Sequence, residues 1–145
     1  MPDGAKSLLE SLPYDEFDSL LDIGPGNGYS AEYFAQQGKD AIATVLGDDK
    51  WGRPSDGDVQ YVQANVESLP FRDGRFDAVW CSHVLEHVRY PGVAFEEIRR
   101  VLNDKGRLFV SVPPFKPLVV GGHLKHGLDA RTVDVRAPAE RIRCS

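Results

Sequence analysis

A glycine-rich segment, GPGNG at residues 24–28, is the first place in the chain where residue types and spacing indicate chemistry. It follows an apolar run at 19–23 and precedes a helical pattern at 29–37. Glycines at such a junction let the backbone turn sharply and bring its amides close to a ligand. The amino end of the following helix favours a carboxylate or phosphate beside it. An ordinary strand-to-helix turn would contain the same glycines, so support is needed from other segments.

Polar residues follow the next two strand-like runs. Asp48 and Asp49 end the second run, where a carboxylate can accept hydrogen bonds from both hydroxyls of a ribose; either residue could take that role. Asn65 and Val66 follow the third run, where a side-chain oxygen can accept from an adenine amine and a backbone N–H can donate to the ring. Asn65 could equally be a turn residue bonded to its own backbone. Loops after parallel strands meet at one edge of a sheet, so we expect these residues to surround one nucleoside.

The elements that position these residues alternate between strand-like and helix-like patterns, which is typical of an α/β protein. We predict strands at 19–23, 41–46, 59–64, 75–81 and 107–112, and helical segments at 5–12, 29–37, 83–88 and 91–102. The expected fold is a doubly wound, Rossmann-like, mostly parallel sheet of about five strands with helices on both faces. The pattern decays after residue 115. We therefore predict a core domain at 1–115 and an irregular tail at 116–145 that lacks a clear antiparallel hairpin.

Composition and charge narrow the class of protein. The chain has 145 residues, of which 41% are hydrophobic and 27% charged, as expected for one folded domain. The net charge of −5 and the lack of a Lys/Arg-rich run argue against a nucleic-acid partner. No apolar stretch approaches the ~20 residues of a membrane span, and the amino terminus does not resemble a signal peptide. Cys81 and Cys144 lie far apart and indicate no disulfide framework, so we expect a cytoplasmic location.

Five segments together resemble the class I S-adenosylmethionine-dependent methyltransferases, in particular the small-molecule type known as methyltransferase-11-like. They are LLDIGPGNG (20–28), VLGDD (45–49), NVESLPF (65–71), GRFDAVWCSHVLEHV (74–88) and GRLFVSVPP (106–114). Their order and spacing match the family over about residues 18–114. The resemblance implies that S-adenosylmethionine is bound and that its methyl group passes by direct displacement to a small-molecule acceptor, which the sequence does not identify.

The resemblance also implies roles for individual residues. The methionine end of S-adenosylmethionine would be held by Asp22, Gly24, Pro25, Gly26 and Gly28. Cys81, Ser82 and His83 would line the floor beneath the sulfonium. His83 is also the candidate general base, which is needed only if the acceptor atom carries a proton of high pKa.

For the nucleoside, the resemblance assigns the ribose to Asp49, or to its neighbour Asp48, and the adenine to Asn65 and Val66. Asn65 departs from the acidic residue more often found at this position. An asparagine can still accept from an amine, so we expect weaker discrimination for adenine rather than none.

Two other kinds of site, a dinucleotide site and a zinc site, have partial matches in the sequence. A dinucleotide oxidoreductase would need a third glycine at position 29, where Tyr29 would obstruct the approach of a pyrophosphate. Residues 83–87 spell H-x-x-E-H, and on a helix His83 and His87 would share a face as two zinc ligands must. That segment directly follows a strand, however, and no distant helix offers a third ligand. We therefore expect no metal site, and expect Glu86 and His87 to orient the loop.

The carboxyl-terminal region raises a second hypothesis about function. Residues 116–145 are too few and too irregular for the helix and two-strand hairpin that usually follow the fifth strand in this family. A truncated domain that binds the donor but does not catalyse transfer is therefore the alternative to an enzyme. An exposed sheet edge would favour a homodimer. The charged run at 96–100 is expected to be a solvated helix face.

Overall fold

The computed structural model describes residues 3–47 and 59–111, with the side chains described from residue 6 onward. Its helices are α1 (Asp3–Glu10), α2 (Tyr29–Gln36) and α3 (Pro91–Val101), with short 3₁₀ turns η1 (Tyr14–Glu16) and η2 (Leu85–His87). Its strands are β1 (Ser19–Ile23), β2 (Asp40–Val45), β3 (Gln60–Gln63), β4 (Phe76–Ser82) and β5 (Leu102–Ser111). Strands and helices thus alternate along the chain, as the sequence pattern predicted.

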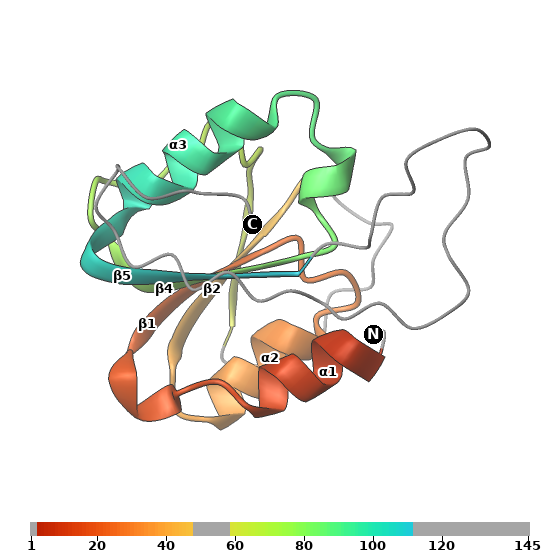
Figure 1. Cartoon of the computed structure of the whole chain (residues 1–145), viewed down its shortest axis with the longest axis vertical. Coiled ribbons are helices and arrows are strands. Elements are labelled where there is room, and N and C mark those ends of the chain that lie inside the picture. The colour runs from red at the N-terminus through yellow and green to blue at the C-terminus, as the bar shows by residue number, and fades with distance from the viewer. Residues whose placement is uncertain (1–2, 48–58, 112–145) are drawn as a thin grey trace, which may run out of the picture.

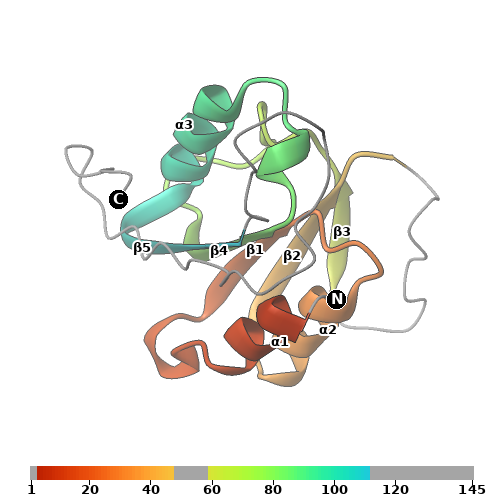
Figure 2. The same ribbon diagram turned by 45° about the vertical axis from the view of Figure 1, so that its right-hand side comes forward.

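The strands form one sheet in the order β3-β2-β1-β4-β5, and every neighbouring pair is parallel. Helices α1 and α2 cover one face and α3 covers the other (Figure 1, with the strand order visible in Figure 2). The predicted fold class is therefore confirmed. Strands β2 and β3 lie on one side of β1, and β4 and β5 lie on the other, so the strand order reverses between β1 and β4. In such sheets a ligand crevice is expected beyond the carboxyl ends of these two strands. The predicted domain boundary at 115 and the carboxyl-terminal tail lie outside the described residues.

Two core layers explain why the strands read as nearly continuous apolar runs, since both faces of the sheet are covered. Toward α1 and α2, Leu20 of β1 and Trp80 of β4 pack with Phe34, whose ring centroid lies 5.9 Å from that of Trp80. Toward α3, Leu21 of β1 packs in a cluster that includes Ile98. Neighbouring residues on one strand thus serve opposite layers, as the alternation of side chains along a strand requires.

The start of β5 differs from the prediction. Residues 103–106, which separate the predicted helix at 91–102 from the predicted strand at 107–112, lie inside β5 as an irregularity in its pairing with β4. The partners step from Phe76↔Leu102 to Ala78↔Arg107, which leaves the intervening residues of β5 bulged. The carboxamide of Asn103 donates to Asp77 Oδ1 at 2.6 Å and accepts the N–H of Lys105 at 3.0 Å. Side chain–backbone bonding therefore shapes the turn while the strand continues.

The remaining elements match their predicted positions to within about two residues, and the turn of helix predicted at 83–88 is the 3₁₀ turn η2. Among residues 3–47 and 59–111, no helix is both long enough and apolar enough to span a bilayer.

Candidate functional site

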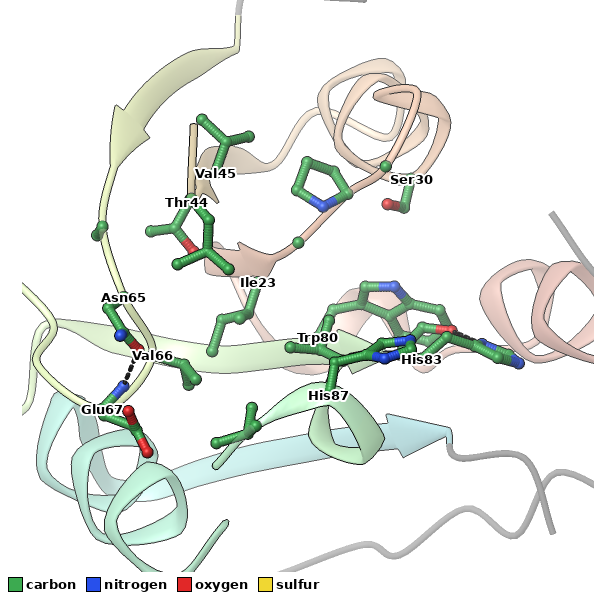
Figure 3. Close-up of a pocket in the computed structure, with 18 of the residues that line it drawn as sticks. Ile23, Ser30, Thr44, Val45, Asn65, Val66, Glu67, Trp80, His83 and His87 are labelled. Atoms are coloured by element: carbon green, nitrogen blue, oxygen red, sulfur yellow. Dashed lines mark hydrogen bonds between the residues drawn. The ribbon is translucent and has the colours of Figure 1, made fainter. Parts of the chain in front are cut away.

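A cavity of about 710 Å³ lies at the carboxyl edge of the sheet, lined by the ends of β1, β2 and β4 and by the loops after β1, β3 and β4. Figure 3 shows Asn65, Val66 and Glu67 on one side, Ser30 on another and His83 beside Trp80. The predicted site residues that line this cavity are Gly24, Pro25, Gly26, Asn65, Val66, Ser82 and His83. Segments far apart in the sequence therefore meet around one space, at the crevice that the strand order predicts.

Two glycines in the first loop have distinct steric roles. Gly24 and Gly26 have φ angles of 66° and 61°, in the left-handed region that disfavours a side chain. A Cβ at Gly24 would lie 2.7 Å from Val84 Cγ2, so this glycine permits close packing against the loop after β4. A Cβ at Gly26 would meet nothing within 4 Å, so its side faces open cavity. Gly28 lies outside the cavity lining and is the N-cap of α2.

Asp22 lies beneath this loop, fully buried and outside the cavity lining. Its Oδ2 accepts a hydrogen bond from Ser30 Oγ at 2.5 Å, and its Oδ1 has no partner. Burial raises the pKa of this carboxyl to about 7, against a smaller lowering by the Ser30 hydrogen bond. Ser30 lines the cavity, so its hydroxyl connects the buried carboxyl to the space where a ligand would lie. The unpartnered Oδ1 is an acceptor that a donor could still satisfy.

Asn65 forms the turn with its own backbone that was one of the two roles expected for it. Its side-chain Oδ1 accepts the N–H of Glu67 at 2.9 Å, and its backbone carbonyl accepts the N–H of Ser68 at 2.9 Å (Figure 3 shows the first bond). A carboxamide oxygen has two lone pairs, so one acceptor position and the amide N–H₂ group remain for a ligand. Val66 is buried in the core layer on the α3 side. The turn fixes the direction in which the Asn65 side chain can meet a nucleobase.

Cys81 does not line the cavity, contrary to its predicted place in the floor. The alternation of side chains along β4 sends it to the α3 face, where it packs in the same cluster as Ile23 and Val110. Burial, together with the negative charges of Asp22 and Glu86, raises the pKa of its thiol well above the usual range. The thiol is therefore an inert core group, and Trp80, on the opposite face, lines the cavity instead.

His83 occupies an unusual backbone conformation at the end of β4. Its φ of 56° lies in the left-handed region, where among the described residues it is the one non-glycine. Its N–H donates to the Ser111 carbonyl at 2.8 Å, which extends the pairing of β4 with β5 by one residue. Nδ1 of the ring lies 2.9 Å from Ser82 Oγ, within hydrogen-bond distance. Strain of this kind persists where neighbouring contacts hold it, and here it fixes the imidazole over the cavity.

The H-x-x-E-H motif at residues 83–87 forms no metal site with other residues in the part of the chain that the structure describes. No group of three His, Cys, Asp or Glu side chains there could hold an ion. The His87 ring is exposed, and its Nε2 lies 3.9 Å from Glu86 Oε1. The Glu86 side chain is buried and its Oε2 has no hydrogen-bond partner.

Sequence reasoning missed several residues of the cavity wall. They are Ile23, Asn27, Ser30, Thr44, Val45, Leu46, Ala64, Glu67, Trp80, Val84, His87, Val88 and Arg89. A usable signal existed for some of them, because Ile23, Thr44, Val45, Leu46 and Ala64 are among the last three residues of predicted strands. The others depend on how the loops fold over. Asp48 and Asp49 lie outside the described residues, although nearby Val45 and Leu46 line the cavity.

With this geometry in place, comparison with known proteins identifies the class. Residues 21–110 match the model of a family described as methyltransferase domain. The chain belongs to this family, that of the class I S-adenosylmethionine-dependent methyltransferases, as the sequence resemblance indicated. The match begins within β1 and ends within β5, so it includes every predicted site residue.

Individual relatives have defined activities in their names. The chain is 37% identical over 103 residues to a demethylmenaquinone methyltransferase of Renibacterium salmoninarum, covering 68% of this chain and 44% of that protein. It is 36% identical over 114 residues to the ubiquinone/menaquinone biosynthesis C-methyltransferase UbiE of an Enterobacter species, covering 69% of this chain and 45% of the relative. The chain therefore spans less than half of the length of these relatives.

Solved structures show the same fold. A putative methyltransferase from Bacillus halodurans superimposes with a TM-score of 0.68 at 30% identity, covering 80% of this chain and 53% of that one. The 1,6-didemethyltoxoflavin-N1-methyltransferase of Burkholderia thailandensis, solved with bound 1,6-didemethyltoxoflavin and S-adenosylhomocysteine, gives a TM-score of 0.65 at 25% identity. The superposition covers 79% of this chain and 53% of that chain.

Proposed function

We propose that this chain binds S-adenosylmethionine and directs its methyl group to a small-molecule acceptor. The observation that carries the proposal is the cavity that the glycine loop after β1, Asn65 and Val66 after β3, and Ser82 and His83 after β4 line together. Relatives named as demethylmenaquinone methyltransferases make a demethylated quinone in its reduced, ring-hydroxylated form the first acceptor to test.

The residues present fit a nucleoside with an amino-acid tail. The open side of Gly26 leaves room for the ligand, and Ser30 with the buried Asp22 supplies polar partners for the methionine end. Asn65 and the Val66 backbone would hold adenine, and Asp48 or Asp49 the ribose. When bound, S-adenosylmethionine supplies an electrophilic methyl carbon attached to a neutral thioether leaving group. The protein therefore has no departing anion to stabilise, and its contribution is alignment and exclusion of water.

A proton must leave the acceptor only if the attacking atom carries one at neutral pH. We propose His83 as the base. In the tautomer in which Nδ1–H donates to Ser82 Oγ, the ring keeps Nε2 free to accept a proton. The left-handed backbone at His83 then serves to hold that nitrogen over the cavity.

Two measurements test the proposal. Calorimetry with S-adenosylhomocysteine and with NAD should detect the first ligand and not the second. A methyl-release assay with a panel of metabolites that includes a reduced demethylmenaquinone should detect turnover. Binding of NAD alone would overturn the proposal. Donor binding without turnover on any acceptor would support instead the second candidate, a domain that binds the donor without catalysing transfer.

The compartment and the oligomer are proposals as well. We propose a reducing, cytoplasmic compartment because Cys81, the cysteine among the described residues, is a free thiol. We propose a homodimer through a sheet edge because β3 and β5, within the described residues, each pair with a single strand.

A further inference from the structure

The loop at 65–71 carries Asn65, Val66 and Glu67 into the cavity. Between β3 and β4 the chain forms no helix and no strand of its own beyond an isolated bridge that joins Asn65 to Ser68. Fixing one backbone conformation costs conformational entropy at every residue of the loop. The loop can therefore present its cavity residues in one geometry only if other elements hold it.

Two side chains from the last turns of α3 supply that support. The Arg100 guanidinium donates to the carbonyl oxygen of Leu69 through Nη2 at 2.9 Å and to that of Phe71 through Nη1 at 2.7 Å. Glu97 Oε2 accepts the N–H of Leu69 at 2.7 Å. The Glu97 carboxylate is itself held by Arg100 Nε at 2.8 Å and Nη2 at 3.0 Å. One ion pair thus bonds three backbone groups on the two sides of Pro70.

The chemistry of this clamp, Glu97 with Arg100, is specific to its residue types. A planar guanidinium with several fixed N–H groups can serve two carbonyls and a carboxylate at once, whereas a lysine ammonium cannot reproduce that fork. The hydrogen bonds from Arg100 lower the pKa of Glu97, so the carboxylate stays charged at neutral pH. With 21% and 31% of their side chains exposed, Glu97 and Arg100 are not the freely solvated helix face that the charge run predicted.

The same helix also holds the loop from its other end. Glu67 Oε1 accepts the N–H of Tyr90, the N-cap of α3, at 2.8 Å. Val66 and Leu69 are buried in the core layer that contains Ala94 of α3. The loop is therefore bonded near both ends of one helix and packed against its middle.

We propose that Glu97 and Arg100 are positioning residues for the cofactor cavity, although neither of them lines it. They hold the 65–71 loop in the conformation that receives the adenine portion of S-adenosylmethionine. The inference rests on the proposed function, since it concerns the same ligand. A loop ordered before binding spares the ligand the ordering cost, so releasing the clamp lowers affinity without removing any contact to the ligand.

The test compares Arg100→Lys with Arg75→Lys in the full chain. Arg75 is a matched control, since 27% of its side chain is exposed and it forms an ion pair with Asp40 at 3.3 Å. Asp40 is the first residue of β2, so this pair lies at the amino ends of the strands, whereas the cavity lies at their carboxyl ends. Calorimetry is run well below the unfolding temperature of every variant, so that a change in folded fraction does not alter the measured affinity. We expect Arg100→Lys to bind S-adenosylhomocysteine about tenfold more weakly and Arg75→Lys to bind like the wild type.

Two further readouts separate positioning from general stability. Amide hydrogen exchange of the unliganded protein should become faster at residues 66–71 in Arg100→Lys and stay unchanged in β1 and β4. The affinity for 5′-methylthioadenosine, which has the adenine and lacks the amino-acid tail, should fall by the same factor as that for S-adenosylhomocysteine. If Arg100→Lys does not fold, Glu97→Gln, which keeps the side-chain shape and removes the charge, takes its place with the same expectations.

The outcomes distinguish this inference from the proposed function. No binding of S-adenosylhomocysteine by the wild-type protein would overturn both. Wild-type binding with undiminished affinity in Arg100→Lys and Glu97→Gln would overturn the clamp alone. So would an equal loss in Arg75→Lys, or unchanged exchange at residues 66–71.

Discussion

At the scale of single residues, Asp22 and His83 occupy unusual environments beside the cavity. Asp22 is a carboxyl buried with one unpartnered oxygen, and His83 is an imidazole on left-handed backbone. Both features lower the stability of the fold: the buried carboxyl through its desolvation, and the left-handed backbone through steric strain. Groups in such environments often serve function at the expense of stability, and the cavity beside them gives that reason here.

Asp22→Asn tests this for the carboxyl. The folded protein holds the Asp22 proton up to a pH of about 7, whereas the unfolded chain releases it near the ordinary pKa of 3.8. The folded state therefore binds more protons in this window, and wild-type stability should fall as pH rises from about 4 to 7. Urea unfolding at pH 5 and pH 8 should show a smaller fall in Asp22→Asn, together with weaker binding of S-adenosylhomocysteine. Parallel pH curves for the two proteins would contradict the assignment.

His83→Ala should lower turnover by roughly 10²- to 10⁴-fold if His83 is the base. Binding of S-adenosylhomocysteine should stay near the wild-type value, because the proposed role concerns the acceptor proton. Steady-state methyl release and calorimetry on the same preparation measure both. His83→Asn is the matched variant, since asparagine tolerates left-handed backbone and separates loss of the imidazole from backbone strain. Unchanged turnover in both variants would dismiss His83 as the base.

At the scale of elements, the turn between β1 and α2 shows how backbone geometry makes room for a ligand. Gly26 has a φ of 61° and open space where a Cβ would project, and it lines the cavity. Gly38, after α2, has a φ of 76° and equally open space, but it lies away from the cavity lining. The two glycines therefore share their backbone requirement and differ in whether a ligand could meet them.

Gly26→Ala and Gly38→Ala should each destabilise the fold by about 1–2 kcal/mol, the cost of left-handed backbone for an L-residue. Only Gly26→Ala should also weaken binding of S-adenosylhomocysteine, because its methyl group enters the cavity. Chemical denaturation gives the first quantity and calorimetry the second. Equal affinities in the two variants would show that Gly26 serves the turn alone.

At the scale of the whole molecule, the described residues form a parallel sheet whose edge strands are β3 and β5. Pairing with a second copy, as in the homodimer proposed above, would cover one of these edge strands. Sedimentation over a wide range of concentrations should then show a dimer whose fraction rises with concentration. A monomer at every concentration would exclude this assembly while leaving the cavity and its ligand untouched.

The sequence by itself determined the order of strands and helices, the family and the loops that meet at the cavity. The order of elements and the loops follow from local periodicity and from glycine and polar residues placed at strand ends, which are readable without knowing distant contacts. For the same reason Gly24, Gly26 and Asn65 could be predicted as site residues from their positions, whereas His83 was predicted from the family resemblance. The family follows from the resemblance of five sequence segments to its members. Asp48 and Asp49 stay predictions, since they lie outside the described residues.

Only the tertiary structure decided which groups bond across the fold. The family resemblance implied that Cys81 lines the cavity floor, but α3 packs against that face of β4, so Cys81 lies in the core. The charge run at 96–100 resembled a solvated surface, yet Arg100 bonds a loop about thirty positions earlier in the chain. The residue type alone says that an arginine side chain can donate hydrogen bonds to carbonyl oxygens. Which carbonyl oxygens lie within reach of Arg100 depends on how α3 and the 65–71 loop pack on the same sheet.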